Sequence, residues 1–350
     1  MIKTVFGLLL ISMLYCSFRA GDSEMLAKGE QPQLATDNKG VVRLVYGKDD
    51  KIFCSTSKDN GLSFSKPVLV GQIAGMHLGM SRGPQLASSS RYSVITAMDK
   101  SGNIHWFRLN NLSGQWISMG LLNDLPGSAP EGLMSIAADR NDNFYAVWLD
   151  IRTGKHNQVY FSSLPGGKTH WGKNILAYSS PDGHVCECCQ PHITAKGAEI
   201  AIMFRNWLNG SRDLYLMTSL NKGKTFSVTQ KLGSDTWKLN GCPMDGGSLM
   251  IQTPGDVATT WQRKGDIYFC RPGQNEVYLG KGSHPSVFES DGNAVVAFHS
   301  KDTIKMLGLK NKKVIIAGEG DYAKAVALPG NQVLSVWEDN NEIKYKRINL

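Results

Sequence analysis

Beyond its first twenty residues the sequence has no long hydrophobic run. A membrane-spanning helix needs about 18 or more consecutive apolar residues without charge, and every later apolar run is shorter and is interrupted by polar or charged residues. This absence excludes a membrane helix from the body of the chain. We therefore expect the mature protein to be soluble, or to be tethered to a membrane only at its start.

The chain also lacks blocks of charge of one sign. Its formal net charge is +8, but the 38 Lys and Arg residues are scattered among 30 Asp and Glu residues. Surfaces that bind nucleic acid usually gather their Lys and Arg residues in a patch or stripe, so we expect no nucleic-acid partner. The modest positive balance suits a surface that attracts anions weakly.

The first twenty residues, MIKTVFGLLLISMLYCSFRA, have the anatomy of a signal peptide. Lys3 precedes an apolar run that ends at Tyr15, which is too short to span a bilayer and is typical of the core of a secretory signal. We expect residues 1–20 to be removed, or Cys16 to be lipidated and to anchor the chain, although the bulky Tyr15 is atypical before a lipidated cysteine. Both alternatives predict export to the periplasm or beyond, with one domain over residues 21–350.

No segment shows the period of an amphipathic helix over a useful length, and one pattern of strands recurs seven times instead. Each copy has a short first segment, a strand that ends in an aromatic residue or Met, and another alternating strand. The middle strands are rich in β-branched and aromatic residues, which favour β-structure. The first segments are PQL at 32, PQL at 84, MSI at 134, PHI at 191, GSL at 247, PSV at 285 and KAV at 324.

Repeats of about 40 to 55 residues with three or four short strands are typical of a β-propeller. The sequence therefore predicts an all-β fold, a β-propeller of seven blades, or of six if the short repeats at 285 and 324 share one blade. The last repeat ends at Leu350 after its third strand. We expect the N-terminal segment around residues 24–28 to supply the missing outer strand and to close the ring, because an open ring would expose a strand edge.

A turn motif follows the third strand of the first repeat. The stretch SKDNGLSF, from Ser57 to Phe64, fits the pattern S-x-D-x-G-x-S/T-F/W, with Asp59 and Gly61 as its D and G. Degenerate copies begin at 163 (SLPGGKTHW) and 219 (SLNKGKTF). On this motif the chain resembles the sialidase-like BNR-repeat, or Asp-box, propellers. The resemblance implies that Ser57 and Asp59 bond the turn backbone and that Phe64 packs beneath it. It indicates a fold and not an activity.

A narrower resemblance rests on three other segments. The C-x-C-C sequence at 186–189, FRNWLNGSRDLYL at 204–216 and WKLNGCPMDG at 237–246 are similar to segments of a subgroup of exported bacterial BNR-repeat proteins. This likeness implies export but no particular chemistry.

Seven cysteines are few for 350 residues, yet three of them fall within four positions. Cys186, Cys188 and Cys189 lie in HVCECCQPH, and Cys242 follows in NGCPMDGG. Both stretches precede the innermost strands of neighbouring blades, so they should meet at one mouth of the central channel. Thiolate and thioether ligands select Cu(I), and four thiolates can hold Zn(II) in a tetrahedron. The predicted ligands are Cys186, Cys188, Cys189, Cys242, Met244 and His192.

Structural disulfides are the alternative, because cysteines of exported proteins are usually paired. A bridge from the 186–189 loop to Cys242 would join two blades and contribute a few kcal/mol. Cys188 and Cys189, however, are adjacent and cannot pair with each other without strain, and three thiols in one loop exceed what one bridge needs. The sequence leaves both alternatives open.

The other soft side chains are expected elsewhere or in the core. Cys54 and Cys270 fall in third strands of repeats that are not adjacent, so we expect buried free thiols. Met76, His77 and Met80 in GMHLGMSRG precede the second repeat, where they either reach the same mouth or pack in the core.

The resemblance also admits an exo-α-sialidase or a related glycoside hydrolase. It implies three arginines that grip a carboxylate, a Tyr nucleophile activated by Glu, and an Asp acid/base. The chain has no clear F-R-I-P segment and no clear third arginine ahead of the tyrosine, so hydrolysis is the second hypothesis. The candidate residues are Arg82, Arg205, Arg212, Tyr322 and Glu131.

We therefore interpret the sequence as an exported, sialidase-like β-propeller that carries a copper-like soft-metal site or a redox site at its channel mouth and does not hydrolyse glycans. Copper(I) or zinc is the expected metal. An unidentified protein or glycan is the expected partner at the mouth. A binding scaffold with inert disulfides is the third hypothesis.

Overall fold

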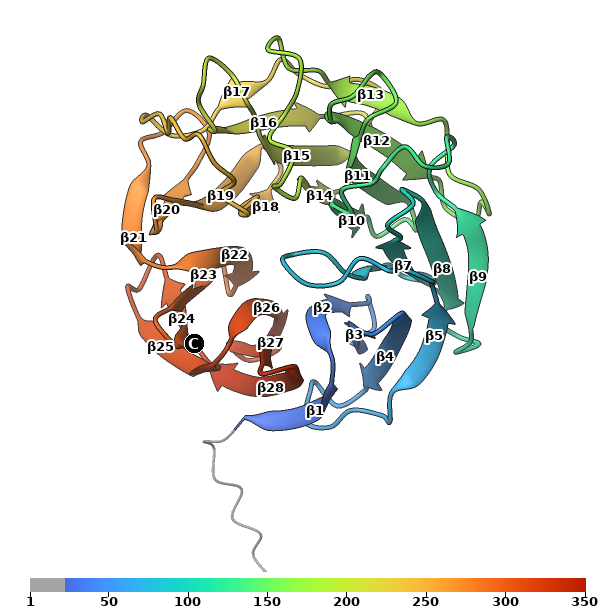
Figure 1. Cartoon of the computed structure of the whole chain (residues 1–350). Coiled ribbons are helices and arrows are strands. Elements are labelled where there is room, and N and C mark those ends of the chain that lie inside the picture. The colour runs from blue at the N-terminus through green and yellow to red at the C-terminus, as the bar shows by residue number, and fades with distance from the viewer. Residues whose placement is uncertain (1–22) are drawn as a thin grey trace, which may run out of the picture.

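The computed structural model describes residues 23–350, so the predicted signal peptide, with Cys16, lies outside the described residues. The described chain forms seven four-stranded antiparallel sheets, which stand as blades around a central axis (Figure 1). The seven-bladed propeller is thus confirmed. The six-bladed alternative is wrong, because the repeats at 285 and 324 each build a complete blade. No helix that could cross a membrane occurs among residues 23–350.

Each blade begins with its innermost strand and runs outward. Blade 1 contains β2 (Glu30–Thr36), β3 (Val42–Lys48), β4 (Lys51–Ser57) and β5 (Val68–Gln72), and blade 2 contains β6 (Gln85–Ser88), β7 (Tyr92–Met98), β8 (Ile104–Asn110) and β9 (Trp116–Leu121). Blade 3 contains β10 (Met134–Ala138), β11 (Phe144–Asp150), β12 (Gln158–Leu164) and β13 (Ile175–Tyr178), and blade 4 contains β14 (His192–Lys196), β15 (Glu199–Arg205), β16 (Leu214–Ser219) and β17 (Gln230–Lys231).

The remaining three blades follow the same plan. Blade 5 contains β18 (Ser248–Thr253), β19 (Asp256–Arg263), β20 (Asp266–Cys270) and β21 (Val277–Lys281), and blade 6 contains β22 (Ser283–Ser290), β23 (Asn293–Ser300), β24 (Thr303–Gly308) and β25 (Val314–Glu319). Blade 7 contains β26 (Asp321–Leu328), β27 (Gln332–Asp339), β28 (Glu342–Asn349) and, as its outer strand, β1 (Glu24–Lys28).

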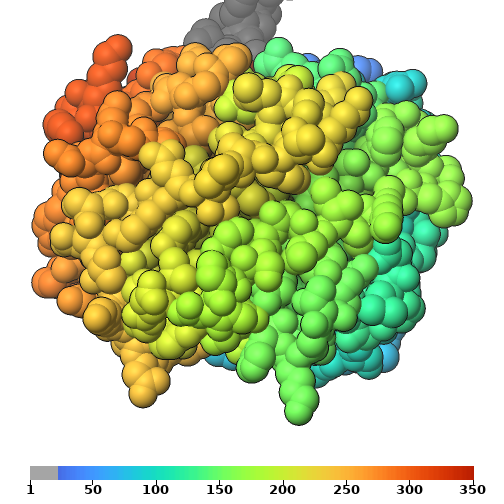
Figure 2. Space-filling model, turned by 90° about the horizontal axis from the view of Figure 1, so that it is seen from above, coloured from blue at the N-terminus to red at the C-terminus, as the bar shows by residue number. Residues whose placement is uncertain are grey.

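The hydrophobic core lies between neighbouring blades. Both faces of a middle strand are covered, and every residue of β11 and of β15 is buried. Between blades 2 and 3, for example, Trp106 packs in one cluster with Trp148. Burial of such large side chains is the main stabilising term for this architecture. Figure 2 shows the rim of the disc, where the surface runs without a break across neighbouring blades.

The ring closes where the two ends of the described chain meet. β1 pairs antiparallel with β28, as the sequence predicted. The Tyr345 hydroxyl on β28 donates to the Glu24 carboxylate across 2.5 Å, and Leu26 and Ala27 pack against the cluster that joins blades 7 and 1. The N-terminal strand therefore covers an edge that would otherwise be open.

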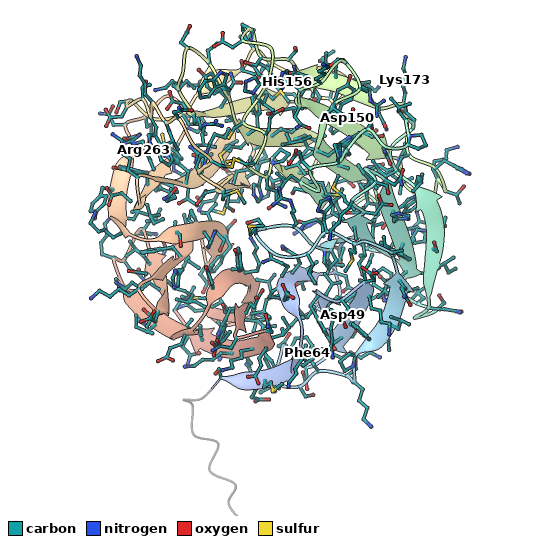
Figure 3. All side chains as sticks on the ribbon, viewed as in Figure 1. Asp49, Phe64, Asp150, His156, Lys173 and Arg263 are labelled. Carbon is teal, nitrogen blue, oxygen red and sulfur yellow. A yellow bond between two sulfur atoms is a disulfide. The ribbon has the colours of Figure 1, made fainter. Side chains whose placement is uncertain are left out.

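The turn that carries Asp59 is held by side chains. The Asp59 carboxylate accepts hydrogen bonds from the Ser57 hydroxyl at 2.7 Å and from the Ser63 backbone N–H at 3.0 Å. The Ser57 oxygen in turn accepts from the Gly61 N–H at 2.8 Å. Phe64, at the rim between blades 1 and 7 (Figure 3), packs edge-on against Tyr345 with ring centroids 4.9 Å apart.

Two other turns repeat this packing. Phe226 of blade 4 lies edge-on against Phe161 of blade 3 at 5.1 Å, and Trp171 of blade 3 lies edge-on against Trp106 of blade 2 at 6.0 Å. In each case the aromatic ring contacts the third strand of the preceding blade. These turns thus join blades to one another as well as closing hairpins.

The innermost strands of blades 6, 7 and 1 each contain a bulge, where the register of pairing shifts. The bulged residues have left-handed backbone angles: Gln31 (φ 54°), His284 (φ 48°) and Tyr322 (φ 54°). A bulge re-aims a side chain, and His284 and Tyr322 line the channel mouth. The bulge also explains why one predicted boundary is wrong. The predicted repeats align Lys324 with Pro32, but the pairing register aligns Lys324 with Gln33. The seventh repeat therefore begins one residue earlier than predicted.

Candidate thiol site at the channel mouth

Two loops meet at the inner ends of blades 4 and 5, as the sequence predicted. One loop holds the cysteines at 186–189 and precedes β14, and the other holds Cys242 and precedes β18. A disulfide joins Cys188 to Cys242, with the two Cα atoms 6.2 Å apart. The structure therefore contains the inter-blade bridge that was one of the two alternatives.

Two further thiols lie against this disulfide. The Cys186 Sγ is 3.4 Å from the Cys189 Sγ and 3.7 Å from the Cys188 Sγ. The sulfurs of all three cysteines lie within 4.8 Å of one another. Cys186 and Cys189 are buried, whereas Cys242 is exposed. The site thus combines an accessible disulfide with two protected thiols.

Arginine side chains supply positive charge to the buried thiols. Arg212 Nη1 donates to the Cys186 Sγ at 3.0 Å, and its guanidinium also lies over the Trp207 ring at 4.6 Å. The hydrogen bond from the Cys189 thiol lowers the pKa of Cys186 to about 6, helped by the charges of Arg212 and Arg205 and opposed by burial. Burial raises the pKa of Cys189 well above its usual range. One thiol of the pair is therefore favoured as a thiolate.

Stacked rings cover the outer side of the cysteine loop. His184, the first residue of HVCECCQPH, stacks on Trp207 at 5.8 Å and lies against His156 at 5.2 Å. One ring nitrogen of His184 lies 2.8 Å from the Val185 carbonyl. The position of His184 is thus explained by stacking and not by metal ligation.

The structure gathers five of the six predicted ligands and separates the sixth. Met244 Sδ lies 3.2 Å from the Cys242 Sγ, so the thioether belongs to the thiol site. His192 does not, because it lies on the innermost strand and lines the axial channel beside Lys324. Burial lowers the pKa of His192 to about 3, and the Lys324 charge acts in the same direction. The structure thus places His192 on the axial channel and apart from the sulfurs, because β14 begins at His192.

The remaining cysteines and the Met and His residues that precede the second repeat lie outside the thiol site. Cys54 and Cys270 are buried free thiols, as predicted. Met76 is buried in the cluster between blades 1 and 2, and the His77 Nε2 lies 2.9 Å from the Pro130 carbonyl oxygen. The connection between β5 and β6 that carries them reaches toward the axis over the channel mouth (Figure 1), where Ser81 lines a small cavity.

The candidate residues for glycan hydrolysis are not assembled into a carboxylate grip. Arg205 is buried, and its guanidinium donates to the backbone carbonyls of Asp245, Arg212 and Gln262 at 2.9, 2.7 and 3.0 Å. Its hydrogen-bonding groups are therefore already committed within the fold. Arg212 is committed to Cys186 and to the Leu239 carbonyl.

Arg82 and Glu131 are paired with each other. Arg82 Nε donates to the Glu131 carbonyl at 2.6 Å, and the two side chains form an ion pair at 3.5 Å. Tyr322 instead stacks on His284 with centroids 4.4 Å apart, and burial, followed by the Asp321 charge, raises the pKa of Tyr322 to about 12. Nothing in these contacts activates Tyr322 as a nucleophile.

Sequence reasoning missed one constellation at this mouth. The His284 Nδ1 lies 2.8 Å from the Asp321 carboxylate, and the buried Asp245 carboxylate has one oxygen without a hydrogen-bond partner. The bulges that aim these residues at the axis leave no clear signal in a single sequence. The position of His284 just before an innermost strand does predict it at the mouth, but its pairing with Asp321 and the proximity of Asp245 were not predicted.

Comparison with solved structures supports the propeller fold. A lectin, BP39L from Burkholderia pseudomallei, is similar over 92% of this chain and 96% of its own, with a TM-score of 0.69 and 10% identity. An α-L-arabinanase from Penicillium chrysogenum matches over 93% and 97%, with a TM-score of 0.55 and 11% identity. The Hadza microbial sialidase Hz136 matches over 94% and 68%, with a TM-score of 0.53 and 12% identity. At such low identity these likenesses show the fold alone.

No family model matches the sequence, and no curated protein matches it significantly.

Proposed function

We propose that the reduced protein binds one soft metal ion, Cu(I) in preference to Zn(II), through the cysteines of the thiol site. The carrying observation is the spacing of the sulfurs, because those of Cys186, Cys188 and Cys189 lie within 4.8 Å of one another. Cys242 is bonded to Cys188, so reduction would leave four thiols in one place. Met244 adds a thioether 3.2 Å from the Cys242 sulfur. Thiolate and thioether donors favour Cu(I).

A purely structural disulfide accounts for only two of these cysteines. Cys186 and Cys189 are free and buried, and they lie in contact with each other and with the bridge. Free thiols beside a disulfide permit thiol–disulfide exchange, which a permanent bridge does not need. A four-sulfur site accounts for all of them.

The Cys188–Cys242 disulfide represents the oxidised form of the proposed site. Two equivalents of a thiol reductant convert this disulfide into two thiols and are themselves oxidised to a disulfide; a phosphine does the same with one water, which supplies the two protons and the oxygen of the phosphine oxide. Metal binding then displaces thiol protons. The reverse oxidation removes two thiolate ligands. The proposed site therefore takes up metal under reducing conditions and releases it on oxidation.

The charges around the sulfurs support this chemistry. Several thiolates in a buried site repel one another, and neighbouring cations stabilise them. Arg212 contacts the Cys186 sulfur at 3.0 Å, and the charge of Arg205 acts on both buried thiols. Arg212 is thus proposed as a positioning residue for Cys186.

We further propose that the protein is exported and that a partner docks at the channel mouth. The apolar run in residues 1–20 supports export, and the exposed Cys242 side of the site supports a protein or glycan partner that docks at the mouth. The committed guanidinium of Arg205 supports a non-hydrolytic function.

Metal titration of anaerobically reduced protein tests the proposal. We expect uptake of one Cu(I) per chain in the presence of a competing chelator, and no uptake after oxidation to the disulfide. The Cys188→Ser, Cys189→Ser double variant should lose this uptake. The matched control is Cys54→Ser, Cys270→Ser, which removes two buried thiols elsewhere and should bind as the parent does. Equal uptake by the parent and the first variant would show that the bridge is only structural.

A further inference from the structure

A cavity of about 250 Å³ lies on the propeller axis, and residues of all seven innermost strands line it. Each blade contributes a polar side chain at the corresponding position of its innermost strand. These side chains are two glutamines (Gln33 and Gln85), three serines, His192 and Lys324. The cavity is thus surrounded by hydrogen-bonding groups, although it lies inside the fold.

The only formal charge on this polar ring is positive. Lys324 is the only Lys, Arg, Asp or Glu residue that lines the cavity, and His192 carries no negative charge in either protonation state. Among residues 23–350 no ion pair joins Lys324 to a carboxylate. The acidic charges that act on Lys324 come from Asp245 and then from Asp321. Asp245 lines the small cavity at the mouth together with Lys324, and the Asp321 carboxylate is engaged by His284. A poorly solvated ammonium without a partner is costly, so the cavity favours an anion.

The neutral groups of the ring also favour an acceptor. The Ser135 oxygen accepts from the Ile193 N–H at 3.4 Å, and the Ser248 oxygen accepts from the Val287 N–H at 3.2 Å. Because a neighbouring blade uses these oxygens as acceptors, the hydroxyl protons are left to donate. The Gln33 amide provides further N–H donors, and the Gln85 amide provides one besides the N–H that it donates to the Gly83 carbonyl at 3.3 Å. The Ser286 hydroxyl is not available, because it donates to the Ala323 carbonyl at 3.0 Å.

We propose that this axial cavity binds a small anion, whose carboxylate or other oxyanion group is held by Lys324 and by the hydroxyl and amide donors of the ring. Charge-assisted hydrogen bonds of this kind are stronger than neutral ones. The volume equals that of about eight waters, so a small dicarboxylate fits as well as an inorganic oxyanion. A second, much smaller cavity of about 20 Å³ lies at the mouth of the channel, where Ser81 is part of its lining. The site is separate from the thiol site and needs no metal.

Anion titration of the full chain tests the proposal. Sulfate and succinate are both dianions of different size, and sodium chloride at matched ionic strength controls for general salt effects. We expect at least one of them to bind saturably in calorimetry and to raise the melting temperature. A preference for succinate would identify an organic ligand, and a preference for sulfate would identify an inorganic oxyanion.

Two variants localise the binding. Lys324→Met should weaken it at least about tenfold, since it removes the only cation of the ring, whereas Lys66→Met, on the exposed rim, should leave it unchanged. The Ser135→Ala, Ser248→Ala double variant keeps the charge and removes two donors, so it should weaken binding by a smaller factor. The proposal is wrong if neither anion binds the parent saturably, or if folded Lys324→Met binds as the parent does.

Discussion

Cys188 and Cys242 are bonded to each other across the boundary between blades 4 and 5, although 54 residues separate them in the sequence. Their Cα atoms lie 6.2 Å apart. Cys242 is exposed, whereas the neighbouring Cys186 and Cys189 are buried. The bond therefore ties two blades together and remains accessible to reductants.

The stability of the protein should depend on redox conditions through this bond. A closed loop of this length constrains the unfolded chain, so Cys242→Ser should lower the free energy of unfolding of oxidised protein by about 2–4 kcal/mol. Urea unfolding with and without a reductant measures the effect. The difference between parent and variant should vanish in the reductant. A difference of the same size in both conditions would mean that Cys242 acts through packing instead.

The contribution of β1 to stability should come from the face of the strand that packs against the core. Leu26 packs against the cluster between blades 7 and 1, whereas the side chain of its neighbour Met25 is exposed. Leu26→Asp should therefore lower the free energy of unfolding by about 2–3 kcal/mol, and Met25→Asp by less than about 0.5 kcal/mol. Thermal and urea unfolding measure both. Equal effects of the two substitutions would contradict closure by this strand.

The Asp59 turn should weaken in acid. The Ser63 hydroxyl, followed by the Ser63 N–H and the Ser57 hydroxyl, lowers the pKa of Asp59 to about 2. An ionised Asp59 therefore stabilises the folded state above the pKa of an unfolded aspartate, about 3.9, and this contribution is lost as the pH falls toward 2. Unfolding free energies of parent and Asp59→Asn should differ less at pH 2 than at pH 7.

Asparagine is a suitable substitute because Asn221 occupies the same place in the blade 4 turn. Its side-chain oxygen accepts from the Thr225 N–H at 2.9 Å. Asp59→Ala, which removes the acceptor altogether, should cost about 1 kcal/mol at neutral pH. If the parent and Asp59→Asn differ equally at both pH values, the carboxylate is not the titrating group.

Hydrolysis of sialosides should be absent. Arg205 donates to three backbone carbonyls, so it cannot also bind a substrate carboxylate without disrupting the fold. A fluorogenic sialoside assay should show no turnover above that of the Tyr322→Phe variant. Turnover by the parent that this substitution abolishes would restore the sialidase hypothesis.

The sequence alone determined the architecture because the strand signal is local. Each blade repeats the same order of turn, apolar strand and aromatic residue, and alternation within a strand specifies which face is buried. Closure of the ring followed from counting, because the last repeat lacked a fourth strand. The cysteine loops could be placed at one mouth because innermost strands of adjacent blades are neighbours in any propeller.

Only the tertiary structure decided which side chains meet within that mouth. His192 stands three residues after Cys189, yet it faces the axis because β14 begins there. Arg205 and Arg212 were candidates for binding a ligand, but their partners are carbonyls and a sulfur from distant segments. The bulge at Tyr322 places Lys324 in the axial ring. Such contacts depend on loop paths and on shifts of one residue, which local sequence preferences do not specify.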